Sequence, residues 1–76
     1  MASRPELVTM MKELELDSKG LTIEQMMEAV RAEADVRWAD KDYKIGADEL
    51  SNTLKHFLVN EYDFVIKDKD GNIIEI

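Results

Sequence analysis

Helical and strand-like patterns follow one another in this chain in an order that restricts its fold. Apolar residues recur at helical spacing in three successive stretches, and the spacing changes to strict alternation after Tyr62. The segment Lys69-Asp70-Gly71 then separates two alternating runs, as a hairpin turn does. Three helices followed by a C-terminal β-hairpin predict an α+β fold with a three-helix core.

The length of 76 residues predicts a single domain over 1–76 with a small core, because a chain of this size buries only about 60% of its unfolded surface. No apolar run reaches the roughly 20 residues that cross a bilayer, and no apolar segment of a signal peptide follows the first residues. The chain has no cysteine, so it can form neither a disulfide nor a thiolate zinc site. We therefore expect a cytoplasmic protein without a membrane partner.

The first helix is predicted over residues 3–17. Ser3 and Glu6 are spaced as a capping box, and Gly20 suits the left-handed residue of a Schellman motif after the helix. Its buried stripe is expected to contain Leu7, Met10, Met11 and Leu14.

The second helix is predicted over residues 22–37. Thr22 and Gln25 form a second capping box at its start. Trp38 continues the apolar face if the helix extends that far, and the charged residues after Ala39 end the pattern. The expected stripe consists of Ile23, Met26, Met27, Val30 and Ala34.

A short extended connector over 43–46 should lead into a third helix over 48–60. Asp48 is the expected N-cap, Glu49 lies in the first turn, and Asn60 is the expected left-handed terminator. The apolar stripe of this helix consists of Leu50, Leu54, Phe57 and Leu58.

Two turns are possible for the hairpin. A two-residue Asp-Gly loop would pair Ile66 with the charged Glu75, whereas a three-residue loop with a glycine bulge pairs Ile66 with Ile74 and Phe64 with Ile76. The second turn places apolar residues beside each other, so it is the predicted one. Because a lone hairpin is marginal in water, its apolar face is expected to pack on the helices.

The sequence lacks the residue patterns of common catalytic and metal sites. It contains no phosphate-binding glycine loop and no nucleophile elbow, and His56 is its single histidine. The segment 68–72 resembles the start of a calcium loop, but Ile73 occupies the position that requires glycine. We expect no enzyme activity, no cofactor and no metal, and we expect His56 to lie on the surface.

Two sets of residues have alternative interpretations. The doublets Met10-Met11 and Met26-Met27 could form an adaptable binding surface, but methionine at helical spacing more often fills a core. Trp38 and Tyr43 lie on either side of an acidic loop. They could contact a partner, and Trp38 could equally belong to the core.

The order of elements resembles that of a winged-helix domain, and Ile45 lies where that family often places its short first strand. The corresponding ranges are helices over 3–17, 22–37 and 48–60, and a strand, wing and strand over 62–76. In DNA-binding members the third helix enters the major groove and the wing contacts the DNA as well. The resemblance therefore implies DNA contacts from Asn52, Lys55, His56, Lys67 and Lys69.

The charge of the chain opposes that function. The chain has 17 acidic and 10 basic residues and a net charge of −7. From Lys44 onward there are four lysines and seven acidic residues, which gives −3 for the half that would face DNA, although phosphate contacts need a basic surface.

The sequence therefore predicts a non-enzymatic protein-binding module that acts as a regulator or inhibitor on a larger basic partner. A DNA-binding transcriptional regulator is the alternative. A self-associating homodimer, paired through the methionine doublets or Ile73–Ile76, is a third interpretation. The expected partner contacts are Arg37, Trp38, Asp42, Tyr43, Asn52, Lys55 and His56.

Overall fold

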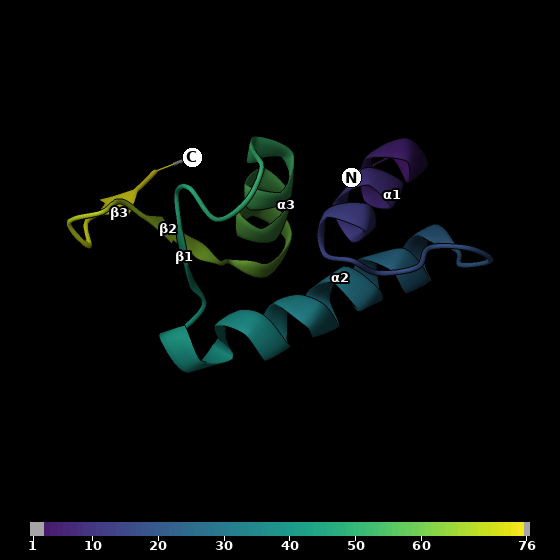
Figure 1. The fold of residues 1–76 in the computed structure, drawn as a ribbon, viewed down its shortest axis with the longest axis horizontal. Coiled ribbons are helices and arrows are strands. Elements are labelled where there is room, and N and C mark those ends of the chain that lie inside the picture. The colour runs from purple at the N-terminus through teal and green to yellow at the C-terminus, as the bar shows by residue number, and fades with distance from the viewer. Residues whose placement is uncertain (1–2, 76) are drawn as a thin grey trace.

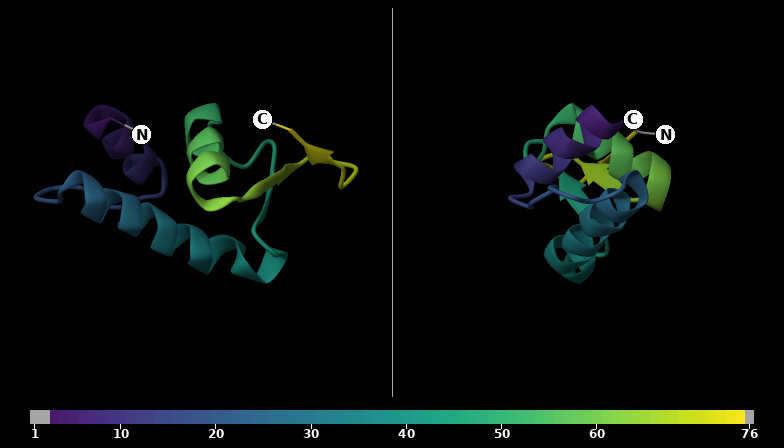
Figure 2. Two further views of the ribbon diagram at one scale, coloured as in Figure 1. Left: turned by 180° about the vertical axis from the view of Figure 1, so that it is seen from behind. Right: turned by 90° about the vertical axis from the view of Figure 1, so that its right-hand side faces the viewer.

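The computed structural model describes residues 3–75, and it has the α+β architecture that the sequence predicts. α1 and α3 lie on the same side of α2, with α1 over its N-terminal half, and the sheet lies beyond α3 (Figure 1). Figure 2 shows the same arrangement from behind, with α2 along one side of the molecule. The elements are α1 (Arg4–Glu13), α2 (Ile23–Trp38), η1 (Ala39–Lys41), β1 (Lys44–Gly46), α3 (Asn52–Tyr62), β2 (Val65–Lys67) and β3 (Ile73–Ile74).

α1 is shorter than the helix predicted over 3–17. The Leu16 N–H donates to the Met11 carbonyl at 2.8 Å, and Glu15 between them has φ = 62°. This is a Schellman motif whose left-handed residue is Glu15, so the prediction that Gly20 ends the helix is wrong. The early end returns the chain toward α2, where Leu16 packs against the core.

The two predicted capping boxes have different outcomes. The Thr22 hydroxyl accepts from the Gln25 N–H at 3.1 Å, and the Gln25 side chain accepts from the Thr22 N–H at 2.9 Å, which confirms the box of α2. The Ser3 hydroxyl instead donates to the Glu6 carboxylate at 3.0 Å and caps no backbone N–H, so the box of α1 is wrong. A charged acceptor makes the stronger hydrogen bond for the serine hydroxyl.

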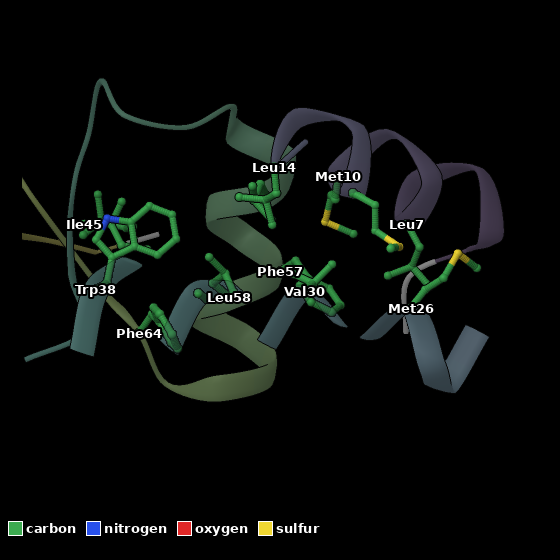
Figure 3. Close-up of a cluster of buried hydrophobic side chains, with 14 residues drawn as sticks. Leu7, Met10, Leu14, Met26, Val30, Trp38, Ile45, Phe57, Leu58 and Phe64 are labelled. Carbon is green, nitrogen blue, oxygen red and sulfur yellow. The ribbon is translucent and has the colours of Figure 1, made fainter. Parts of the chain in front are cut away.

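The core gathers one face of each helix and the inward side of the sheet. α2 ends at Trp38, one residue beyond the predicted range of 22–37, and Trp38 is only 4% exposed. Figure 3 shows Trp38 with Ile45 at one end of the cluster and Leu7 and Met10 at the other end. The buried methionines Met10, Met11 and Met26 confirm the core interpretation of the doublets, while Met27 is half-buried.

α3 begins later than predicted, because Ser51 rather than Asp48 caps it. The Ser51 hydroxyl accepts from the Leu54 N–H at 3.3 Å. Glu49 lies outside the helix, and its carboxylate accepts from the Gly46 N–H at 2.6 Å. The segment from Gly46 to Glu49 therefore forms a turn, and α3 begins only after it.

The end of α3 also differs from the prediction over 48–60. Asn60 remains helical, and Asp63 takes the left-handed conformation with φ = 58°. Its N–H donates to the Val59 carbonyl at 3.2 Å. The later end places Phe64 directly before β2, where its side chain is buried.

The sheet is mixed, with the order β1-β2-β3. β1 runs parallel to β2 with Ile45 beside Ile66, and β3 runs antiparallel to β2 with Ile74 beside Ile66. The predicted pairing of Ile66 with Ile74 is thus confirmed. The predicted pairing of Phe64 with Ile76 lies outside the described residues.

The hairpin turn is the predicted three-residue loop with a glycine bulge. The Gly71 N–H donates to the Asp68 carbonyl at 3.1 Å, and Gly71 has φ = 85°. The Asp68 carboxylate accepts from the N–H groups of Asp70 and Asn72, both at 2.9 Å. The calcium-like segment therefore has a complete structural role as a turn.

Half of the hairpin does not pack as predicted. Phe64 and Ile66 are 3% and 2% exposed, whereas Ile74 is 39% and Ile73 is 66% exposed. β2 lies between two strands and packs against α3, while β3 is an edge strand. The expectation that Ile74 is buried is therefore wrong. α3 packs against β2, and Ile74 lies on the edge strand beyond it.

Candidate protein-interaction surface

A groove of about 450 Å³ lies between α1 and α3. Met10 and Phe57 line it as apolar residues and are themselves almost fully buried. The remaining lining is polar and consists of Glu6, Asn52, Thr53, His56, Asn60 and Glu61. The structure thus brings Asn52 and His56, two of the predicted contact residues, to one surface.

A two-part hydrogen bond ties together the helices that form the groove. The Ser51 N–H donates to Oε2 of Glu13 at 2.9 Å, and the Ser51 hydroxyl donates to Oε1 of the same carboxylate at 2.6 Å. Glu13 is the last residue of α1 and Ser51 is the N-cap of α3. The bond therefore fixes one end of α1 against the start of α3.

Lys55 does not lie on the exposed face of α3, so its expected position beside Asn52 and His56 on that face is wrong. It is only 9% exposed, and its Nζ donates to the Ala47 carbonyl at 2.7 Å. The turn between β1 and α3 passes over the lysine and provides this acceptor. Its methylene groups are buried in the same contact, as is usual for a lysine that lies along apolar surface.

The groove lining is acidic, and three of its polar side chains have no hydrogen-bond partner within residues 3–75. Glu6 and Glu61 are the charged residues that line it, with no lysine or arginine among the described lining residues. Within residues 3–75, the side chains of Asn52, His56 and Asn60 make no hydrogen bond to protein. The negative charge of the groove comes from Glu6 and Glu61.

Two predicted contacts at the end of α2 have internal roles. Trp38 is buried, which favours the core interpretation over recognition. The Arg37 side chain lies 3.0 Å from Glu33 and donates to the Leu14 carbonyl at 3.1 Å. Arg37 thus joins α2 to the end of α1, and its guanidinium is already engaged.

Asp42 and Tyr43 remain on the surface beyond α2. Both have positive φ, 57° and 60°, at the sharp entry to β1. Tyr43 is 38% exposed and packs edge-on against Phe64, with ring centroids 5.1 Å apart. Neither residue lines the groove between α1 and α3, so the structure does not join the two predicted contact regions in one site.

The hairpin turn forms a second hollow of about 430 Å³ with the turn before α3. Its two lysines, Lys67 and Lys69, are outnumbered by the carboxylates of Asp48, Glu49, Asp68 and Asp70. Two cations against four anions leave this surface acidic as well. The predicted DNA-contacting wing therefore lacks a basic surface.

One carboxylate in this hollow has a shifted pKa. The hydrogen bond from the Gly46 N–H holds the pKa of Glu49 below its ordinary value, and partial burial opposes this effect. Lys41, whose Nζ lies 3.7 Å from Glu49, lowers the pKa further. Glu49 is therefore ionised at neutral pH and closes the turn at the end of β1.

The acidic residues of the groove were not identified from the sequence. Glu6 precedes Met10 by four residues and so shares its side of α1, and Glu61 follows Phe57 by four residues on α3. That spacing could have placed each residue beside an apolar stripe. The sequence does not show which two helices face each other, and this decides that both residues line one groove.

Comparison of the chain with protein-family models, curated proteins and solved structures yields no match. Within residues 3–75, no group of three or more histidine, aspartate or glutamate side chains is arranged to hold a metal ion. None of the helices in the described range combines the length and apolar character of a membrane span. The geometry and the charge of the two surfaces therefore carry the argument about function.

Proposed function

We propose that this protein is a small acidic, non-enzymatic protein-binding module that docks on a larger basic partner as a regulator or inhibitor. One observation carries the proposal: the exposed face of α3 presents Asn52 and His56 to a groove whose charged lining residues are Glu6 and Glu61, while Lys55 is turned inward. A surface of this charge attracts a basic partner and accelerates the encounter.

The alternative is a winged-helix regulator that binds DNA. It is supported by the passage of α3 into a hairpin with a tight three-residue turn, as a wing requires. Asn52 could read a base edge from α3. The charge of the two surfaces disfavours this alternative, because Lys55 bonds to Ala47 and the wing lysines lie among carboxylates.

Duplex DNA discriminates between the two functions. We expect a fluorescent 20-base-pair duplex to show no saturable binding up to about 100 µM protein, at low salt or at about 200 mM salt. The readout is fluorescence anisotropy. Binding at low micromolar affinity that weakens steeply with salt would reverse the order of the two proposals.

Site-specific photo-crosslinking tests protein binding directly. A photoreactive amino acid in place of His56 should capture a basic protein in the native host, and the same amino acid in place of exposed Lys19 should not. Capture at both positions, or at neither, would contradict docking through α3. The captured protein should also bind the purified module more weakly as salt is raised.

A further inference from the structure

The groove between α1 and α3 combines an apolar base with charge at its walls. Met10 and Phe57 are 1% and 7% exposed, so each contributes only a small apolar area to the bottom of the groove. Glu6 comes from α1 and Glu61 from α3, so carboxylates reach the groove from both helices. One oxygen of Glu6 accepts from the Ser3 hydroxyl at 3.0 Å, and the other oxygen has no hydrogen-bond partner among residues 3–75.

The groove has the dimensions of a peptide site. Its α3 lining runs from Asn52 to Glu61, a distance of about 14 Å at the rise of an α-helix. About four residues of extended chain cover that length. The side-chain amides of Asn52 and Asn60 stand along it, and each can both donate to and accept from a peptide backbone.

Arginine fits this lining better than other side chains do. Its guanidinium pairs with a carboxylate through two parallel hydrogen bonds, and its methylene stem packs along apolar surface. A phosphate or carboxylate ligand would meet the charges of Glu6 and Glu61 without a cation among the lining residues. The charge of the groove therefore selects a cationic segment.

We propose that this groove binds an arginine-bearing segment of a partner protein. The guanidinium pairs through two hydrogen bonds with Glu61 or through one with the second oxygen of Glu6, and the arginine stem lies along the small apolar area left by Met10 and Phe57. The amides of Asn52 and Asn60 bind the backbone of the segment. This inference depends on the proposed function, since it names the part of the basic partner that the module recognises.

A peptide titration tests the inference. The probe is an alanine-based 10-residue peptide with two arginines and blocked, uncharged termini. Its control replaces both arginines by citrulline, which is neutral but similar in shape. Binding is followed by amide chemical shifts of the isotope-labelled protein. We expect a dissociation constant of about 1 mM, with shifts concentrated at Asn52, His56 and Asn60, and none with the citrulline peptide.

Matched double variants separate a site from general charge attraction. E6Q/E61Q should weaken the arginine peptide roughly five- to tenfold, because two exposed charge pairs are lost. E28Q/D40N changes the net charge equally at exposed positions outside the groove and should leave the affinity within about twofold. Unchanged amide spectra away from the substitutions confirm that both variants fold.

Three outcomes would overturn the inference: no localised shift with the arginine peptide, equal shifts with the citrulline peptide, or equal weakening in both double variants. None of these outcomes contradicts the proposed function by itself. That function fails separately, if crosslinking at His56 captures no basic protein or if duplex DNA binds tightly.

Discussion

β1 and β3 flank the same strand, but their environments are opposite. Ile45 at the centre of β1 is fully buried, whereas Ile73 and Ile74 of β3 are 66% and 39% exposed. β1 pairs with β2 in parallel across a segment that includes all of α3, while β3 follows β2 through a tight turn. The strand that is close in sequence is thus the less buried neighbour.

The hydrogen bonds at the two edges differ as well. The Val65 N–H donates to the Tyr43 carbonyl at 3.0 Å, and the Ala47 N–H donates to the Lys67 carbonyl at 2.9 Å. These bonds continue the pairing beyond both ends of β1, while the bonds of the hairpin turn are local to Asp68. The burial of a strand depends on the elements that pack over it and not on how close it lies to its neighbour in sequence.

The largest expected effect comes from shortening the buried isoleucine of β1, compared with the same substitution in β3. Ile45→Ala should lower the free energy of unfolding by about 3 kcal/mol, because it leaves a cavity in the core. Ile73→Ala should change it by less than about 0.5 kcal/mol, as expected for an exposed side chain. Urea unfolding measures both values, and equal losses would break the comparison between the strands.

Two lysines give the second test. Lys55→Ala should cost about 2 kcal/mol, since it removes a buried stem and the bond to the Ala47 carbonyl. Lys69→Ala in the exposed hairpin turn should be nearly neutral. Lys55→Met keeps the apolar stem and should recover part of the lost stability. If Lys55→Ala left the stability unchanged, the inward position of this side chain would be contradicted.

The hairpin turn gives a smaller and more local effect. Asp68→Ala removes the acceptor of two backbone N–H groups and should cost about 1 kcal/mol. Hydrogen exchange should accelerate at the amides of β3 and stay unchanged at β1. Faster exchange at Ile45 would show that the two edges unfold together.

The smallest expected effect is a loss of folding stability in acid through Glu49, which closes the turn after β1. Because the folded state lowers the pKa of Glu49, its ionised form stabilises the fold above the unfolded-state pKa, near 4.5. That stabilisation is lost as pH falls through the lower folded-state pKa. The effect is small because the carboxylate is 43% exposed.

Glu49→Gln provides the control for this pH dependence. The difference in unfolding free energy between the wild type and E49Q should be largest at neutral pH and should approach a constant minimum below pH 4.5. Chemical denaturation at pH 7, 5, 4 and 3 gives the comparison. A difference that grows on acidification would mean that the pKa of Glu49 is raised in the folded state.

Local signals allowed correct prediction where a few neighbouring residues satisfy one another. Thr22 and Gln25 form their capping box, and the turn at Gly71 fixes the pairing of Ile66 with Ile74. The start of α3 could not be predicted in the same way. Asp48 is a good local cap, but Ser51 is held by Glu13 from α1 and caps the helix instead.

The candidate site was predicted only in part. Asn52 and His56 were expected on the exposed face of α3, and they line the groove. Lys55 was expected beside them and is buried, because the chain between β1 and α3 folds over it. Glu6 was not expected at all, since its contribution requires α1 to lie opposite α3.

The sequence by itself determined most of the three apolar helical stripes (Leu50, expected in the third, lies before α3), the hairpin turn and an overall negative charge, because each depends on spacing or on a sum of residues. The tertiary structure decided which helices face each other, that β1 rather than β3 is buried, and that Lys55 turns inward. Those outcomes depend on contacts between residues far apart in the chain, such as Glu13 with Ser51. Local patterns do not contain that information.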